Sequence, residues 1–427
     1  MNIPLDRLYS YLGSLTNDNM IIYHWYPHGS KNLDDLTHWH NKKPEISWLE
    51  YMTHPSLIFH DQEPLNYHLY SVDQFEQRIS DRGNIIWSKS PYVVNCVANS
   101  HLRSCLKIPV NCQQYTILCH SEKNSKDLEL YKSNDFVDVY YWSHAIIAKD
   151  WFRFAESDAG LRPNFESINS DFLIYNRAWS GTREYRLKFS ELLLSKNLLK
   201  QCNMRFNPID DNLHYSDHKF ANPNLKIKNF DFEQYFQLND APSHASADYD
   251  TSDYSSAAIE VILETLFDDT RNHLTEKTLR SIACGKPFML AATPGSLQYL
   301  RDYGFETFDG LINESYDLIT DPVERLSAIV SEMQRISNLS KDEKTKLWQE
   351  LYSISMRNQK RFFSQEFFDY VINEFKHNLR TALDQCNQHI TDRWWGIASD
   401  QQNYTHEIPR TENYRVMTAW LKNHFNQ

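Results

Sequence analysis

Glu276 and Lys277 place a carboxylate beside a mobile cation at the predicted start of a helix. Thr275, the residue before them, is a good N-cap, because its hydroxyl can accept from the first free backbone N–H groups. Free N–H groups and the helix dipole also make such a start a natural site for anions. A nucleotide needs this combination, since its ribose hydroxyls require an acceptor and its diphosphate requires a cation. The residues therefore predict a nucleotide site at this helix.

A second group of cations follows a predicted strand at 171–175. Asn176 and Arg177 come directly after that strand, and Arg183 lies further along the same loop. Arginine suits a diphosphate because its planar guanidinium donates hydrogen bonds in pairs. The alternative is a set of surface arginines paired with acids, and the residues alone favour neither. Lys277 in the predicted nucleotide site tips the balance toward phosphate binding.

Carboxylates and histidines gather where the predicted N-terminal strands end. Asp61 and Glu63 follow a strand at 56–60, and either carboxylate could act as a general base if burial raised its pKa toward neutrality. The structural alternative is an acid that caps the next helix, with Pro64 in its first turn. Nearby histidines could contact an acceptor or a leaving group, and the alternative for each is a hydrogen-bonding loop residue. These histidines are His24, His60, His120 and His144.

Strands alternate with helix-length segments along most of the chain, which is typical of an α/β fold with a parallel sheet. Residues 203–250 are polar and are predicted to be irregular, and long amphipathic helices replace the strand pattern after Phe308. The predicted strands are 20–26, 56–60, 84–87, 115–119, 137–142, 171–175, 258–265, 287–292 and 305–308. The predicted helices are 5–15, 184–197, 275–285, 297–302, 321–338, 341–363 and 365–383.

Composition excludes several classes of protein. The chain has 427 residues, 41% of them hydrophobic, which is enough for two domains with sizeable cores. A net charge of −12 argues against a broad surface for nucleic acid or anionic membrane. Seven cysteines form no CxxC pair, and Asp248, Asp250 and Asp253 lack the rest of a calcium loop, so no metal is expected. Glycine-rich phosphate loops are absent, which argues against a kinase, an ATPase or a dinucleotide-dependent dehydrogenase. The sequence shows neither a signal peptide nor a run of about 18 apolar residues, so a cytoplasmic location is expected.

These motifs resemble those of a two-domain GT-B glycosyltransferase, and the family that they are most similar to is the fucosyltransferase family that makes α1,3 linkages. That family has a Glu-Lys element followed by a helix, a glycine end and a strand containing proline, as in residues 274–288. It also has an Asn/Arg loop, which Asn176-Arg177 with Arg183 resembles. Its proposed catalytic base lies in a Glu-Ser-Pro element, which Glu63-Pro64 matches in part because the serine is missing.

The chain is also similar to glycosyltransferase-like proteins of tailed phages, with which it shares the stretches YPHGS, HDQEPLNY, HSEKNS and LTEKTLR. These resemblances imply two Rossmann-like domains that face a cleft, in a protein of a bacterium or a phage-infected cell. The acceptor domain would span 1–165, the donor domain 166–320, and a helical extension 321–427.

The resemblance implies an inverting, metal-independent transfer of a hexose or fucose from a nucleotide sugar to an acceptor hydroxyl on a glycan. The donor, a GDP- or UDP-linked sugar, would be a substrate rather than a cofactor. Glu276 would hold the ribose, Lys277 with Arg177 or Arg183 would neutralise the diphosphate, and Glu63 or Asp61 would take the acceptor's proton. One alternative is a transferase acting on a hydroxymethylated base of phage DNA. Another is a non-catalytic binding or structural protein, in which these donor-site residues would not converge.

Overall fold

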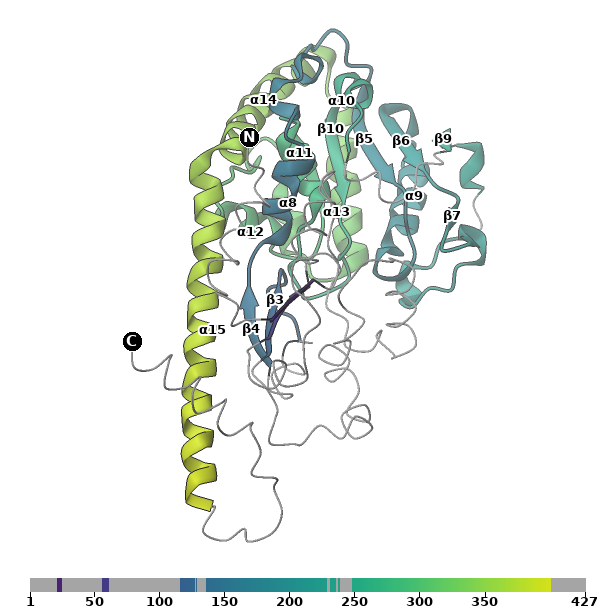
Figure 1. Ribbon diagram of the computed structural model, residues 1–427. Coiled ribbons are helices and arrows are strands. Elements are labelled where there is room, and N and C mark those ends of the chain that lie inside the picture. The colour runs from purple at the N-terminus through teal and green to yellow at the C-terminus, as the bar shows by residue number, and fades with distance from the viewer. Residues whose placement is uncertain are drawn as a thin grey trace. The chain divides into compact units, whose positions relative to one another are not determined.

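The computed structural model describes residues 21–24, 56–60, 116–126, 128, 136–228, 231–235, 237–238 and 248–400 (Figure 1). The chain divides into two compact units. The first comprises Met1–Arg7, Glu122–Ser125 and Trp142–Ile372, and the second comprises Leu8–Ser121, Lys126–Tyr141 and Asn373–Gln427. These units interleave in sequence, whereas the ranges 1–165, 166–320 and 321–427 are contiguous and stay a prediction.

A five-stranded parallel sheet forms the centre of the first unit. Its order is β11-β10-β5-β6-β9, so the chain starts in the middle, moves to one edge, and returns to build the other side. The direction of winding therefore reverses between β5 and β10. The strands are β5 (Ser170–Asn176), β6 (Cys202–Phe206), β9 (Gln237–Leu238), β10 (Ala257–Leu263) and β11 (Phe288–Ala291). All residues of β10 are buried, as expected of a central strand covered on both faces.

Helices cover both faces of this sheet. Tyr175 donates to Asp253 of α10 and packs under Arg280 of α11, whereas the neighbouring Asn176 donates to Ser190 of α9. Because successive strand residues point to opposite faces, α9 lies on one face and α10 with α11 on the other. These helices are α9 (Tyr185–Ser195), α10 (Thr251–Ser256) and α11 (Glu276–Ala283).

Helices α8, α13 and α14 pack against the helices of this core (Figure 1). Helix α13 contacts α9, and α11 contacts both α8 and α14. The elements are α8 (Ser143–Trp151), α12 (Ser296–Asp302), α13 (Pro322–Ser337), α14 (Lys341–Phe363) and α15 (Gln365–Asp400), with a small hairpin of β7 (Ile209–Asp210) and β8 (Leu213–His214). Single turns of 3-10 helix are η3 (Ala155–Ser157), η4 (Ala159–Leu161), η5 (Gly181–Arg183), η6 (Leu199–Gln201), η7 (Tyr215–Asp217), η8 (Pro223–Leu225) and η9 (Phe232–Gln234), and a longer one is η11 (Glu314–Leu318).

The second unit contains a four-stranded parallel sheet whose order follows the chain. Its strands are β1 (Ile21–His24), β2 (Ser56–His60), β3 (Thr116–His120) and β4 (Phe136–Tyr140). The part of α15 from Asn373 onward belongs to this unit, where Asn378 donates to the carbonyl of Tyr140. The prediction of an α/β fold with parallel sheets and crossover helices is confirmed.

Two predicted elements were wrong. The segment 203–250 was expected to be irregular, but it supplies β6, which pairs with β5 inside the sheet. Its sequence, CNMRF, alternates polar and apolar residues over too short a run to stand out from the loops around it. Residues 305–308 were predicted as a strand, but they are an irregular segment after α12, with Phe305 and Phe308 buried. The predicted helix 5–15 and strand 84–87 lie outside the described residues.

Within the described part of the chain, no helix is long and apolar enough to cross a membrane.

Candidate functional site

The carboxyl ends of β5 and β10 lie side by side where the winding of the sheet reverses. Ile174 pairs with Val261, so three residues further along each chain Arg177 comes opposite Glu264. The loop after β5 is tied to the end of β10 by Thr182, whose hydroxyl donates to the carbonyl of Thr265 at 2.9 Å. Ligands of open α/β sheets bind in the crevice outside the strand ends at such a switch point. This edge of the sheet is therefore the candidate site.

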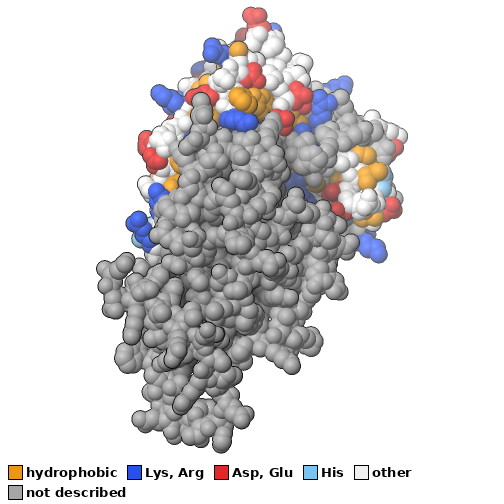
Figure 2. Space-filling model, viewed as in Figure 1, with side chains coloured by type: hydrophobic (Ala, Val, Ile, Leu, Met, Phe, Trp, Pro, Cys, Tyr) orange, Lys and Arg blue, Asp and Glu red, His pale blue; other side chains and the backbone are white. Residues whose placement is uncertain are grey.

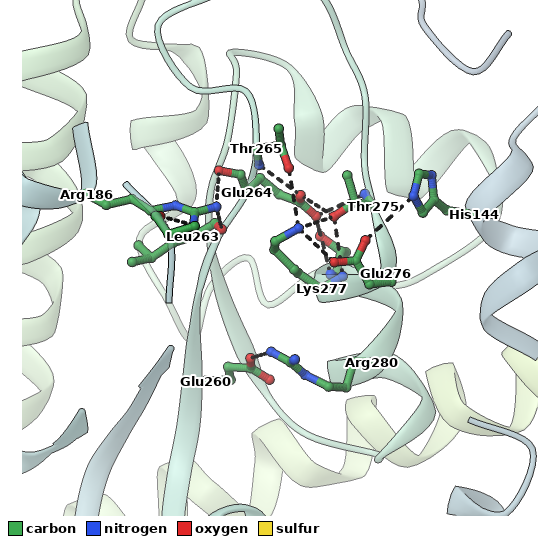
Figure 3. Close-up of polar contacts among 12 residues, drawn as sticks. His144, Arg186, Glu260, Leu263, Glu264, Thr265, Thr275, Glu276, Lys277 and Arg280 are labelled. Atoms are coloured by element: carbon green, nitrogen blue, oxygen red, sulfur yellow. Dashed lines mark hydrogen bonds and ion pairs between the residues drawn. The ribbon is translucent and has the colours of Figure 1, made fainter. Parts of the chain in front are cut away.

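Glu264 fixes the start of α11 (Figure 3). Its buried carboxylate accepts from the backbone N–H and the hydroxyl of Thr275, and from the same two groups of Thr278. It also accepts from the backbone N–H of Thr265. Thr275 is the N-cap of α11, as predicted, and its hydroxyl accepts from the N–H of Lys277. Glu264 thus holds the first turn of the helix in place from the neighbouring strand.

The helix start is consequently not an open anion site, contrary to the expectation from sequence. The backbone donors of Thr275 and Thr278 are taken by Glu264, and that of Lys277 is taken by the Thr275 hydroxyl. A carboxylate in this position already satisfies the positive end of the helix dipole. An incoming phosphate would have to be bound by side chains.

The same holds for the turn 293–296 at the start of α12. The N–H of Leu297 at the start of α12 donates to Asp317 Oδ2 at 3.1 Å. Burial raises the pKa of Asp317 to about 6, although backbone donors from α12 oppose that shift. Gly295, with φ of +80°, makes the turn possible. This turn is therefore explained by helix capping.

Glu276 and Lys277 contact one another in the first turn of α11 (Figure 3). Lys277 Nζ lies 2.8 Å from Glu276 Oε1, and also 3.1 Å and 3.3 Å from the hydroxyls of Thr275 and Thr265. The Lys277 side chain is 19% exposed and that of Glu276 10%. The cluster keeps a cation and a carboxylate together at the edge of the sheet, within reach of a ligand.

His144 belongs to this cluster and comes from a distant part of the sequence. It lies in the first turn of α8, and its Nε2 is 3.6 Å from Glu276 Oε2. Its ring packs edge-on against that of His273, with 5.2 Å between centroids. Trp142 Nε1 donates to the carbonyl of Leu274 at 3.0 Å, which attaches the start of α8 to the loop before α11. The prediction had grouped His144 with the acceptor side, but the structure places it beside Glu276.

Arg177 carries donors that have no partner among the described residues. Its guanidinium lies over the Tyr175 ring, 4.3 Å from the centroid, and Nε and Nη1 are buried without a hydrogen-bond partner among the described residues. Burial lowers the pKa of Arg177, and the nearby charge of Arg280 lowers it further. A buried charge without a partner costs several kcal/mol. An anionic ligand would supply the missing acceptors.

The other predicted donor-site residues have structural partners. Asn176 is fully buried, and its amide donates to Ser190 Oγ and to the carbonyl of Arg186, which holds α9 against β5. Arg183 Nε donates to the carbonyl of Ser180. Among the described residues, no hydrogen bond or ion pair joins Arg177 or Arg183 to Glu276 or Lys277. Among the described residues the cluster around Glu276 and the two arginines are therefore separate groups at one edge of the sheet, which is the arrangement that the non-catalytic alternative predicts.

Asp210, in the hairpin β7–β8, is an acid whose pKa the nearby charge of Arg183 helps to lower. Its carboxylate accepts from the backbone N–H groups of Trp179 and Ser180 at 2.7 Å and 2.6 Å. Burial opposes ionisation of Asp210, but these donors and the charge of Arg183 outweigh it and lower the pKa. Arg183 thus sits beside an internal acid, as in the alternative that the sequence left open.

The residues predicted for the acceptor side lie in or near the second unit's sheet. His24, His60 and His120 are the last residues of β1, β2 and β3, and His60 and His120 are paired in register. His120 Nε2 lies 3.6 Å from Asp138 Oδ2. Asp61 and Glu63 lie outside the described residues.

Sequence reasoning missed Glu264, Thr265 and His273. Glu264 was assigned to the strand, although an acid directly after the apolar run of β10 signals a strand end that faces polar groups. Within the described residues, no group of three or more His, Cys, Asp or Glu side chains is arranged to hold a metal ion. A scan against models of known protein families matches none of them to this chain, and a search among curated proteins finds no match.

Proposed function

We propose that the protein is a glycosyltransferase that moves a sugar from a nucleotide-sugar donor to an acceptor hydroxyl. The donor would bind at the carboxyl edge of the five-stranded sheet, between β5 and β10. Counted along the chain, the order of these strands is 5-4-1-2-3, which is that of a Rossmann-like nucleotide-binding sheet. By the resemblance to two-domain GT-B transferases, the unit that contains the four-stranded parallel sheet would bind the acceptor.

The unused donors of Arg177 carry this proposal. A guanidinium whose buried Nε and Nη1 lack acceptors among the described residues favours a ligand with at least two closely spaced anionic oxygens. A diphosphate meets that requirement, and Lys277 supplies a second cation at the start of α11. Glu276, whose Oε1 accepts from Lys277, would accept from a ribose hydroxyl once Lys277 turns to the diphosphate.

The reaction that follows is a single displacement at the anomeric carbon. The acceptor oxygen forms the new glycosidic bond while the bond between the sugar and the diphosphate breaks, and the configuration inverts. Negative charge grows on the leaving diphosphate, where Arg177 and Lys277 would stabilise it. The acceptor's proton would pass to Glu63 or Asp61, the candidates for the base. No metal ion is needed in this scheme, because the two cations take its place at the diphosphate.

A thermal-shift screen tests the proposal. GDP-, UDP-, CMP- and dTDP-sugars are each added to the protein, and the account predicts that a nucleoside diphosphate sugar raises the melting temperature, since a ligand that binds the folded state stabilises it. Replacing Lys277 with Ala should reduce that shift, whereas Lys341→Ala, at the exposed start of α14, should leave it unchanged. If no nucleotide sugar shifts the wild-type protein, the proposed function is wrong.

Charge on the described surface bears on the acceptor. Figure 2 shows basic and acidic side chains interspersed over the described residues on the face drawn. Duplex DNA requires a continuous basic surface to neutralise its phosphates. The net charge of −12 favours a glycan over a DNA base as the acceptor. Transfer of labelled sugar to hydroxymethylated DNA would reverse this preference.

A further inference from the structure

Glu276 forms an ion pair with Lys277, and the proposed reaction needs the ammonium of Lys277 at the diphosphate of the donor. Lys277 Nζ lies 2.8 Å from Glu276 Oε1, so in this arrangement the two charges neutralise one another. A diphosphate would draw the ammonium of Lys277 away, because it offers greater negative charge. Glu276, whose side chain is only 10% exposed, would then lose the ion pair with Lys277, and that loss opposes binding of the donor.

His144 lies where it can compensate for that loss. Its Nε2 is 3.6 Å from Oε2 of Glu276, whereas Lys277 holds the other oxygen, Oε1. A formed N–H···O hydrogen bond measures about 2.7–3.2 Å, so this contact is not yet closed. A small rotation of the Glu276 side chain, once Lys277 leaves it, would close it. Figure 3 shows His144 and Lys277 approaching the carboxylate from different sides.

The imidazole of His144 is fixed in the orientation that this exchange requires. A carboxylate can only accept, so the Nε2 that faces Glu276 has to carry the proton. Ser143 Oγ lies 3.5 Å from Nδ1, the other ring nitrogen. The ring of His273 packs edge-on against the imidazole, and Trp142 ties the start of α8 to the loop before α11.

We propose that His144 is a positioning residue that takes over the Glu276 carboxylate when Lys277 turns to the diphosphate of the donor. This inference rests on the proposed nucleotide-sugar function. It assigns to α8 a part in donor binding, through Glu276, and separates His144 from the histidines at the ends of β1, β2 and β3.

Calorimetric titration with GDP and UDP tests the exchange in a double-mutant cycle. His144→Leu keeps the bulk of the side chain without its donor and should weaken nucleotide binding about tenfold, the loss expected for one hydrogen bond to a charged group. His144→Gln restores an N–H donor and should bind close to wild type. In a Glu276→Gln background the neutral amide needs no replacement partner, so adding His144→Leu should change the affinity less than about twofold. His377→Leu, an exposed histidine of α15, is the control.

Each outcome decides between the two proposals. If the wild type binds GDP or UDP but His144→Leu binds equally well, or its effect persists undiminished beside Glu276→Gln, the exchange is wrong and the proposed function stands. If His144→Leu and His144→Gln lose affinity equally, His144 serves packing only and the exchange is again wrong. If the wild-type protein binds neither nucleotide, this inference is overturned, and the proposed function is overturned as well if no nucleotide sugar of the thermal-shift screen binds.

Discussion

Replacing Glu264 with Gln should loosen the first turn of α11 and the cluster that it carries. The carboxylate accepts from two backbone N–H groups and two hydroxyls of that turn, and from the N–H of Thr265. An amide keeps one accepting oxygen, so the N–H of Thr265, 3.2 Å from Oε2, would face a donor instead. An orphaned buried N–H costs about 1–3 kcal/mol. Loss of the charge at the helix start adds about 0.3–1 kcal/mol, so the total is about 1–4 kcal/mol.

Hydrogen–deuterium exchange of the peptide spanning 273–285 measures this loss locally. The exchange of the α11 amides should accelerate in Glu264→Gln, because the opening free energy of that segment falls by the amount above. Glu350→Gln, an exposed acid of α14, should leave exchange in this peptide unchanged. Unaltered protection of α11 in Glu264→Gln would refute the role assigned to Glu264.

Two further predictions concern residues at the end of α11. Burial lowers the pKa of Lys286 from 10.5 to about 7, so between these values the unfolded chain binds more protons. The free energy of unfolding of the wild type, relative to that of Lys286→Met, should therefore rise by up to about 1.4 kcal/mol per pH unit between pH 7 and 10, with no such gain below pH 7. Urea unfolding measures both proteins, and a difference between them that does not change from pH 7 to 10 would contradict this. Gly285 has φ of +62°, and an added Cβ would meet Met356 Sδ at 3.0 Å. Gly285→Ala should cost about 1–2 kcal/mol of stability because of its backbone conformation alone. It should cost more than Gly310→Ala, where an added Cβ meets open space. Equal losses of stability in thermal unfolding would exclude a contribution from the contact with Met356.

The strands that the sequence predicts best are the continuous apolar ones. AAIEVIL of β10, apolar except for Glu260, and FMLA of β11 are buried throughout, so burial on both faces leaves a direct signature in composition. The short β6 is part-buried and mixes polar with apolar residues, and its place in the sheet depends on pairing with β5. Such a strand is specified by its neighbours, which is why local periodicity does not reveal it.

The features of the site likewise fall into those that depend on neighbours in sequence and those that depend on other elements of the fold. The cap at Thr275 and the pair Glu276-Lys277 depend on neighbours in sequence, and their local placement is confirmed. Glu264 and His144 act on this pair from other elements, which no local pattern indicates. The expectation of free helix-start donors failed for that reason, because the acid that fills them comes from the preceding strand.

The central claim is that Arg177 at the junction of β5 and β10 binds the diphosphate of the donor. The most direct test is calorimetry of GDP and UDP with Arg177→Met, using the exposed Arg162→Met as control. Since the guanidinium has buried donors without partners among the described residues, its removal should leave the melting temperature equal to or above that of the wild type. Nucleotide affinity should nevertheless fall by about 10- to 100-fold, the effect of losing hydrogen bonds to a charged group. Wild-type affinity in Arg177→Met would contradict the claim.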